Sequence, residues 1–430
     1  MTDGMSQQPT EYQSYGQSIG GSYGQSNSGV YGVNFSQQNQ PNQYGGVPAT
    51  SYSSPAPGVH NLSHNMPGYI PPYQTPNSGL GFGFGTGAGY SSQSQSYQQQ
   101  SNTQQTNYSS STPMAQYQGT VRQYPNFNAT QDAEALKKAM RGFGCDDKTV
   151  MNILCNRSNA QRQQIRQAFK TMYGKDLIAE LISELKGNFE DLIVALLYTP
   201  AEFDVRELDY AMRGLGTTES TLIEIMTTRT NAEIQAIKQA YKIIYHTELE
   251  DALSGETSGH FRRMLVSLTV GGRDESSQTD RNRAVQQAKQ LYEDGEKRWG
   301  TVESTFNSTM IMNNPSQLQA IFAEYQKLTG HDIEQAVRNE FSGDILDGML
   351  ALVKIGKNRP AFFAEKAYLA MKGLGTDDRS LIRVVVSRCE KDTVQIKQEY
   401  QRLYKTTLET DISGDTSGKY KEGLLTLLRG

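Results

Sequence analysis

The sequence predicts an all-α protein built from four repeated helical units and preceded by a low-complexity tail. Three observations support this prediction. Charged residues are confined to the later part of the chain, a short glycine motif recurs at regular distances, and apolar residues follow each motif with helical spacing. No run of alternating polar and apolar residues, which would indicate a half-buried strand, competes with that spacing.

Charge divides the 430-residue chain into two parts. Residues 1–121 contain no Lys or Arg, and Asp3 and Glu11 are their only acids. The rest of the chain therefore holds all 41 basic residues and nearly all of the 45 acidic residues. It is long enough to bury a large core.

The first part consists mainly of Gln, Ser, Gly, Tyr and Asn. With so few aliphatic residues it cannot bury enough apolar surface to offset the entropy of ordering the chain. Regularly spaced tyrosines in such a background are typical of segments that associate weakly with themselves. We therefore expect residues 1–125 to be a disordered tail that self-associates or recruits a protein partner.

Several classes of protein are disfavoured. The N-terminal residues lack the features of a secretory signal, and no apolar run approaches the roughly 18 residues that a membrane span needs. Cys145, Cys155 and Cys389 are an odd number of cysteines and make no disulfide framework. No hydrolase, nucleotide-binding, zinc-protease or EF-hand motif occurs. We expect a cytoplasmic protein that is not an enzyme.

The glycine motif marks the repeats. It occurs at Met140–Gly144, Met212–Gly216 and Met371–Gly375. The gap between the second and third copies is about twice the first, so a degenerate copy is expected between them, and Gly295–Thr301 is the candidate. The expected units cover residues 126–198, 199–270, 283–354 and 360–430.

Each unit is expected to be helical. Apolar residues follow the glycines at spacings that place them on one helix face, as at Val150, Ile153 and Leu154. Three Thr-x-x-Glu pairs match the capping box that begins many helices. These pairs are Thr230 with Glu233, Thr247 with Glu250, and Thr406 with Glu409.

The glycine loops indicate a cation site. Two glycines in a short loop let the backbone adopt positive φ and direct several carbonyl oxygens to one point. Calcium takes six to eight oxygen ligands, including carboxylates. An acid follows the second glycine at the same distance in all four units, which a helix cap alone does not explain. The four acids are Glu184, Glu256, Glu340 and Asp415.

Together, the Met-Lys/Arg-Gly-x-Gly loop and the acid some forty residues later resemble the annexin family over about residues 126–430. The tail resembles that of the long-tailed, synexin-like members. The resemblance implies four five-helix repeats in a curved disc with calcium loops on its convex face. It also implies calcium-dependent binding to membranes that contain acidic phospholipid.

Carried over to this sequence, the resemblance gives four ligand sets, each with three backbone carbonyls and one carboxylate. The first is Met140, Gly142, Gly144 and Glu184, and the second is Met212, Gly214, Gly216 and Glu256. The third is Gly295, Arg298, Gly300 and Glu340, and the fourth is Met371, Gly373, Gly375 and Asp415.

Two features depart from the family pattern. Cys145 stands where the loop usually has threonine, which would remove a helix-capping hydroxyl worth about 1 kcal/mol, and Asp146 is expected to substitute. The third loop has Arg298 in place of glycine, and its unit has Asn313 where the others have Arg157, Arg229 and Arg388. The third site is therefore expected to bind calcium least well.

The middle residue of each loop is apolar and is suited to the membrane interface. These residues are Phe143, Leu215, Trp299 and Leu374. The alternative is that they pack back onto their own repeat.

Two functions remain open. The first is a calcium-dependent peripheral membrane protein whose tail clusters it or recruits partners during membrane aggregation, fusion or trafficking. The second is a ribonucleoprotein or condensate component driven by the tail, with the helical part as adaptor. The helical part has no concentrated basic patch, so direct binding of nucleic acid is not expected.

Overall fold

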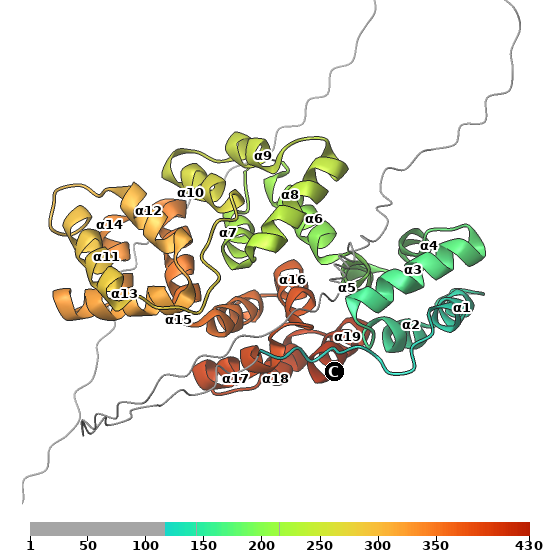
Figure 1. The fold of residues 1–430 in the computed structure, drawn as a ribbon. Coiled ribbons are helices and arrows are strands. Elements are labelled where there is room, and N and C mark those ends of the chain that lie inside the picture. Colours follow the sequence, from blue (N-terminus) through green and yellow to red (C-terminus); the bar gives the residue numbers. More distant parts are fainter. Residues whose placement is uncertain (1–116, 143, 215) are drawn as a thin grey trace, which may run out of the picture. The chain divides into compact units, whose positions relative to one another are not determined.

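The computed structural model describes residues 117–142, 144–214 and 216–430 (Figure 1). Every helix or strand assigned in that part of the chain is an α-helix, so the all-α prediction is confirmed. Nearly all of the predicted tail, residues 1–116, lies outside the described residues.

The first ten helices form two repeats of five. Repeat 1 contains α1 (Ala129–Ala139), α2 (Asp147–Leu154), α3 (Asn159–Tyr173), α4 (Leu177–Glu184) and α5 (Gly187–Leu197). Repeat 2 contains α6 (Pro200–Met212), α7 (Glu219–Thr228), α8 (Asn231–Tyr245), α9 (Leu249–Glu256) and α10 (Gly259–Thr269).

The remaining helices form repeats 3 and 4, which share one bent helix. Repeat 3 begins with α11 (Arg281–Asp294), α12 (Glu303–Met312), α13 (Pro315–Thr329) and α14 (Ile333–Glu340). The shared helix is α15 (Gly343–Met371), and repeat 4 continues with α16 (Asp378–Arg388), α17 (Thr393–Tyr404), α18 (Leu408–Asp415) and α19 (Gly418–Arg429).

The bend in α15 separates the last helix of repeat 3 from the first helix of repeat 4. Asn358 has the non-helical angles φ −162° and ψ 95°, and Pro360 follows it. The Asn358 side chain accepts a 3.0 Å hydrogen bond from the Ala361 N–H, as the N-cap of a new helix does. Each repeat therefore has five helices.

Local capping explains several helix starts. Thr230 and Glu233 form the predicted capping box at the start of α8. The other two predicted boxes are wrong because each placed the cap one residue too early. The N-cap of α9 is Glu248 and that of α18 is Thr407, which accepts the Thr410 N–H.

The apolar helix faces form the core, as the spacing predicts. Val150 and Leu154 of α2 are fully buried, and so are Leu222 of α7 and Leu381 of α16 at matching positions. Burying an aliphatic side chain of this size stabilises the fold by about 1.5–3 kcal/mol. The repeated spacing therefore places equivalent side chains in each repeat's core.

In repeats 1 and 2 a buried ion pair joins the first and second helices. Arg157 donates two hydrogen bonds to Asp132, at 2.7 and 2.9 Å. Arg229 binds Asp204 in the same bidentate way, at 2.7 and 2.6 Å. All four residues are buried, so each charge is compensated in surroundings with little access to water.

Repeats 3 and 4 lack this pair. In repeat 4 Phe363 occupies the position of the acid, and the Arg388 guanidinium lies over its ring at 4.4 Å from the centroid. Arg388 pairs instead with Asp392, one helical turn along the chain. In repeat 3 Asn313 replaces the arginine and donates to the Thr309 carbonyl at 2.8 Å.

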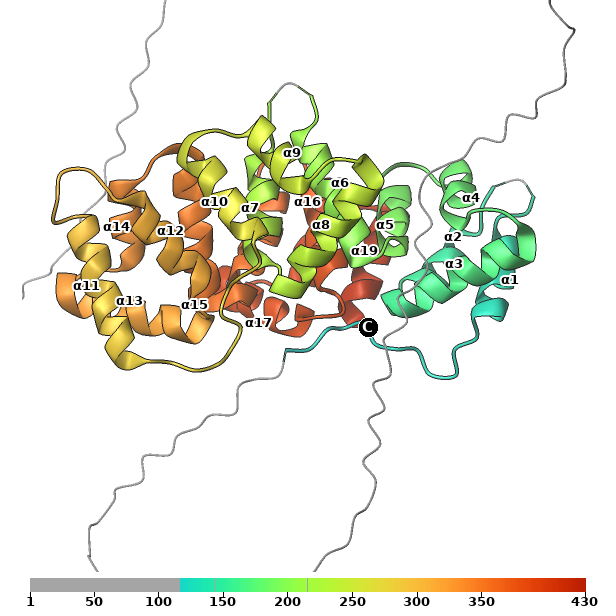
Figure 2. The ribbon, with the colours of Figure 1, turned by 45° about the horizontal axis from the view of Figure 1, so that its top comes forward.

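The repeats pack in two pairs. α5 of repeat 1 contacts α16 and α19 of repeat 4, and in Figure 2 α5 and α19 lie side by side. α10 of repeat 2 contacts α12 and α15 in the same manner. The second and fourth repeats also meet, because Arg383 of α16 binds Glu224 of α7.

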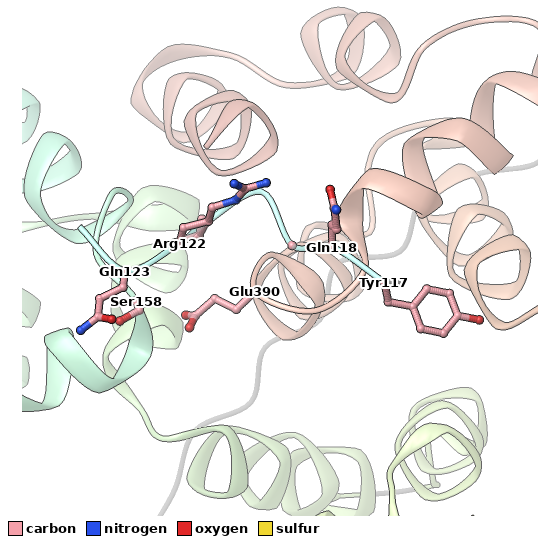
Figure 3. Close-up of a pocket in the computed structure, with 8 residues that line it drawn as sticks. Tyr117, Gln118, Arg122, Gln123, Ser158 and Glu390 are labelled. Carbon is pink, nitrogen blue, oxygen red and sulfur yellow. The ribbon is translucent and has the colours of Figure 1, made fainter. Parts of the chain in front are cut away.

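Residues 117–125, which the sequence analysis placed at the end of the disordered tail, are instead packed and cross from repeat 4 to repeat 1 (Figure 3). The Val121 N–H donates to the Cys389 carbonyl at 2.9 Å, and Val121 itself is buried. Gly119 runs so close to Glu390 that a Cβ would stand 2.3 Å from the Glu390 backbone. Tyr124 completes the crossing with its ring over Arg157. A cavity of about 470 Å³ remains beside this segment.

Candidate calcium sites

Three of the glycine loops share two backbone features among their described residues. Both glycines of each loop have positive φ, with 105° at Gly142 and 89° at Gly144 in repeat 1. Each loop is closed by one hydrogen bond from the residue before the next helix to the end of the preceding helix. These bonds are Asp146 N–H to Ala139 O (2.9 Å), Thr218 N–H to Ala211 O (2.8 Å) and Asp377 N–H to Ala370 O (2.7 Å).

The third loop is one residue longer. Its closing bond runs from the Val302 N–H to the Asp294 carbonyl at 2.8 Å and spans one residue more than the others. Gly295 therefore occupies the position of the loop methionines, as the predicted ligand set assumes. Its carbonyl already accepts a 3.0 Å hydrogen bond from the Arg298 N–H. Gly300 is the one residue of this loop with positive φ.

The four acids have one structural position. Each is the last residue of the short fourth helix of its repeat, where the chain turns toward the fifth helix. Glu184 ends α4, Glu256 ends α9, Glu340 ends α14 and Asp415 ends α18. The sequence distance from loop to acid is therefore constant because the second, third and fourth helices, with their turns, have the same total length in each repeat.

A threonine hydroxyl joins the loop to the acid in repeats 2, 3 and 4. The residue after the second glycine donates to the backbone oxygen of the acid, from Thr217 to Glu256 at 3.2 Å. Thr376 does the same toward Asp415, and its hydroxyl also contacts the carboxylate. The third pair is Thr301 and Glu340. The expectation that this threonine caps a helix is wrong, because the N-caps are the residues that follow it.

Repeat 1 lacks this hydroxyl because Cys145 occupies its position. Burial and, after it, the charges of Asp147, Glu184 and Asp146 raise the pKa of Cys145 to about 11, so the residue remains a neutral thiol. Cys145 and Glu184 line the same cavity, so the acid lies near the loop here too. Asp146 caps α2 by accepting the Thr149 N–H at 3.2 Å, as expected.

The loops fit a hard cation. Each combines peptide carbonyls with a partly or fully exposed carboxylate, and these oxygen donors are the ones that calcium prefers. Space in front of the loops is open, since a Cβ at any of the positive-φ glycines would meet no atom within 4 Å. The predicted ligand carbonyls lie in these loops, at the ends of α1, α6, α11 and α15.

Two of the four predicted membrane-contact residues can be placed. Trp299 and Leu374 are exposed to 103% and 109% of their reference areas, so neither packs back onto its repeat. Phe143 and Leu215 lie outside the described residues. In the part of the chain that the structure describes, no helix is both long enough and apolar enough to span a bilayer.

The sequence did not indicate the buried charges between the repeats. Glu207 and Glu224 of repeat 2 both bind Arg383 of repeat 4, and all three are buried. One feature of the sequence could have indicated these buried charges. Glu224 interrupts the apolar run Leu222–Met226, and a charge on a helix buried on every side needs a partner.

Fold and loops together define a class of protein: an all-α tandem-repeat protein with an oxygen-donor cation loop in each repeat. The annexin family model matches residues 131–196, 203–268, 286–352 and 362–427, one match in each repeat. The chain belongs to the annexin family.

Long-tailed annexins are among its relatives. The chain is 50% identical to human annexin A11 over 312 residues, which is 73% of this chain and 62% of that protein. It therefore spans less than two thirds of that relative. It is 48% identical to annexin A7 of Macaca fascicularis over 322 residues. Bovine annexin A4 is 48% identical over 317 residues, and 99% of that shorter protein is covered.

Solved annexin structures have the same fold. Annexin III matches 73% of this chain and 98% of its own, with 44% identity and a TM-score of 0.72. A structure of calcium-bound annexin (Sm)1 matches with 30% identity, a TM-score of 0.67 and coverage of 73% and 93%.

Proposed function

We propose that this chain binds membranes containing acidic phospholipid in a calcium-dependent manner. The observation that carries the proposal is the pairing, in each repeat, of a carbonyl-bearing loop with a carboxylate at the end of the fourth helix. Membership of the annexin family and the calcium-bound annexin (Sm)1 structure support calcium as the cation.

The donor count explains why membrane and calcium would act together. Three carbonyls and one carboxylate fill only part of a calcium shell, which needs six to eight oxygens. Lipid phosphate oxygens can supply missing ligands. Affinity for calcium is then weak in solution and rises on a phospholipid surface, because each ligand stabilises the binding of the other.

The four sites are not equivalent. Those of repeats 2 and 4 have two positive-φ glycines and the threonine link to the acid, so we assign them the highest affinity. The site of repeat 1 lacks the threonine. The site of repeat 3 has the longer loop, and the Gly295 carbonyl is already hydrogen-bonded, so we assign it the lowest affinity.

Exposed apolar side chains at the loops add a second contact. Trp299 and Leu374 are fully exposed beside sites 3 and 4, and a tryptophan favours the membrane interface. We assign both residues, with Phe143 and Leu215, to the membrane-contacting surface. The protein would be cytoplasmic at low calcium and peripheral on membranes when calcium rises, with no enzymatic activity.

The composition of the tail supports a separate role. A Gln-, Ser-, Gly- and Tyr-rich segment favours self-association or partner recruitment, which would link membranes during aggregation, fusion or trafficking. The same composition also supports the alternative function, in which the protein is a component of a ribonucleoprotein or condensate and the helical part is an adaptor. Deleting residues 1–116 distinguishes the two, since calcium-dependent lipid binding persists under the first and localisation is lost at any calcium level under the second.

Co-sedimentation with phosphatidylserine vesicles tests the proposal. We expect the protein to pellet with calcium and to stay in solution with chelator. A variant that combines E256Q and D415N should need several-fold more calcium. Failure of the unmodified protein to pellet at millimolar calcium would refute the membrane function.

A further inference from the structure

The cavity of about 470 Å³ beside residues 117–125 has one cation in its lining (Figure 3). We call these residues the crossing segment and the cavity the Arg122 pocket. Two walls come from the repeats, at Ser158, the N-cap of α3, and at Glu390 between α16 and α17. The other walls belong to the crossing segment itself and include Gln118, Arg122 and Gln123.

The Arg122 pocket contains two unused polar groups. Arg122 is exposed, and within the described residues its guanidinium contacts no acid, carbonyl or aromatic ring. The Oε1 atom of Glu390 accepts the Asn159 N–H at 2.7 Å and lies 3.5 Å from Arg162. Its Oε2 atom accepts no hydrogen bond from any described residue. The pocket therefore offers the open face of a planar cation and a free carboxylate oxygen.

The crossing segment itself shows how tyrosines bind arginines of the repeats. The Tyr117 ring centroid lies 5.1 Å from the guanidinium carbon of Arg359, and that of Tyr124 lies 3.6 Å from that of Arg157. The planar guanidinium is well suited to such cation–π contacts. Both tyrosines of the segment that follows the tail thus bind the repeats through an arginine.

The tail lacks any such cation of its own. Residues 1–116 contain eleven tyrosines and no Lys or Arg, whereas the rest of the chain holds all 41 basic residues. Two tails therefore cannot form arginine–tyrosine contacts with each other. Contacts of this kind between copies must run from the tail of one copy to the described part of another.

The linker between repeats 2 and 3 provides an internal comparison. Its Asp274 N–H donates to the Met312 carbonyl at 2.9 Å, which is the bond that Val121 makes in the crossing segment. The next residue is Glu275, where the crossing segment has Arg122. The Glu275 carboxylate already accepts a backbone N–H at 2.8 Å. An acid in this position cannot bind the face of an aromatic ring as a cation does, so the free arginine distinguishes the crossing segment from the linker.

We propose, building on the self-association proposed above for the tail, that the Arg122 pocket binds a tyrosine from the tail of a second copy of this chain. The tyrosine ring stacks on the Arg122 guanidinium, and its hydroxyl donates to the free oxygen of Glu390. The side chains of Gln118 and Gln123 can bond to the peptide groups on either side. A cavity of this volume is in the range of small-molecule sites and has room for a tyrosine side chain.

Many weak contacts can then build an assembly. A single cation–π contact is weak, but one tail has eleven tyrosines and can reach the pockets of several copies. Linked contacts of this kind strengthen one another through effective concentration. The assembly requires neither calcium nor a membrane, because Arg122 belongs to none of the calcium loops.

The first test measures self-association of full-length protein in chelator by sedimentation velocity over a series of concentrations. R122Q should raise the concentration at which half of the protein is associated by about fivefold, since it removes one cation–π contact. R281Q removes an exposed arginine of α11 and should associate like wild type. Both variants should unfold at the wild-type temperature, because neither arginine is buried.

The second test mixes two variants that lack opposite halves of the contact. One is R122Q with an intact tail, and the other keeps Arg122 but has all eleven tail tyrosines replaced by serine. At the concentration where half of the wild type is associated, each variant alone should be mostly monomeric. The equimolar mixture, with one variant carrying a fluorescent label, should form complexes that contain both.

Three results would overturn the proposal: R122Q associates as readily as wild type, R281Q loses as much association as R122Q, or the mixture forms no mixed complexes. The first of these would leave direct tail–tail contacts as the cause, and the third would indicate contacts within one copy. A wild-type protein that stays monomeric at every concentration would refute the proposed self-association of the tail as well. None of these outcomes bears on calcium-dependent vesicle binding, which is measured separately.

Discussion

Arg383 of repeat 4 and Glu224 of repeat 2 form a bidentate ion pair across the repeats, with 3.0 and 3.1 Å between nitrogen and oxygen. Both are essentially inaccessible to water, and a second acid, Glu207, contacts the same guanidinium at 3.2 Å. One arginine thus neutralises charge on two helices of another repeat. The packing of repeat 4 on repeat 2 therefore depends on buried charges that must pair with one another because water does not reach them.

The two acids should respond differently to neutralisation. Burial raises the pKa of Glu207 and is not fully offset by Arg379 and Arg383, whereas for Glu224 the attraction of Arg383 outweighs burial and lowers the pKa. We expect E224Q to cost about 3 kcal/mol of unfolding free energy at pH 7, since it removes the bidentate partner of Arg383 and leaves only the single contact with Glu207. E207Q should cost little or nothing, because Arg383 keeps Glu224 and burial already disfavours the charged form of Glu207.

The pH dependence checks this assignment in urea unfolding. A carboxyl with a lowered pKa stabilises the fold above its unfolded pKa, and that contribution is lost as pH falls through the folded pKa. The difference between wild type and E224Q should therefore persist until strongly acid pH. Because the pKa of Glu207 is raised, the sign is opposite there: wild type should gain stability relative to E207Q as pH falls through the folded pKa of Glu207 toward its unfolded pKa. The opposite sign at either residue would contradict the assignment.

The acids at the sites should matter for calcium and little for folding. Glu256 is exposed, and Thr217 binds its backbone oxygen, so the carboxylate is not needed for that contact. E256Q should change the unfolding free energy without calcium by no more than about 0.5 kcal/mol. With calcium and phosphatidylserine vesicles it should need several-fold more calcium to bind. D251N removes an acid from the same helix and should bind like wild type.

Cys145 offers a gain of function. Replacing it with threonine supplies the hydroxyl that ties loop to acid in the other repeats. One neutral hydrogen bond is worth about 0.5–1.5 kcal/mol, so C145T should raise the calcium affinity of site 1 by about two- to twelvefold if the hydroxyl holds the loop in its binding conformation. The background E256Q/E340Q/D415N isolates this site for calcium titration. Equal affinity in C145T and its parent would show that the hydroxyl does not organise the site.

The thiols should be unreactive at neutral pH. Burial raises the pKa of Cys389 to about 11 and that of Cys155 to about 12, and both side chains are fully buried. Cys145, with a pKa of about 11, is partly exposed. Folded protein should alkylate slowly and only at Cys145, at a rate that rises with pH toward 11, whereas unfolded protein should label at all three. Rapid labelling at pH 7 would contradict the burial.

Local regularities in the sequence were sufficient to predict the fold. A recurring glycine motif and helical spacing predict helices, repeats and the loop–acid pairing, because each depends on residues within one unit. The Arg383–Glu224 contact joins residues 159 positions apart, and no periodicity reports such a partner. The role of Thr217 was missed for another reason. Its hydroxyl is one residue before the helix and could serve either as a cap or as a link to the acid.

The third loop could be identified from its spacing, and the predicted ligand set already places Gly295 and Gly300 one position further apart than Met140 and Gly144. The sequence did not indicate the closing bond from Val302 to Asp294 or the hydrogen bond that the Gly295 carbonyl accepts, because a degenerate motif does not determine the backbone path of its loop. The calcium ligands themselves remain predictions. Carbonyl direction depends on the backbone angles of the loop, which residue type does not determine apart from the preference of glycine for positive φ.

Trp299 provides the most direct report of membrane contact. It is the only tryptophan in the chain and is fully exposed, so its fluorescence reports this one position. Emission should shift to the blue when calcium and phosphatidylserine vesicles are added together, and neither alone should have this effect. W299A should still bind, with a modest loss of affinity, because the calcium sites remain. Binding without any shift would support calcium-dependent lipid binding but would contradict the assignment of Trp299 to the membrane interface.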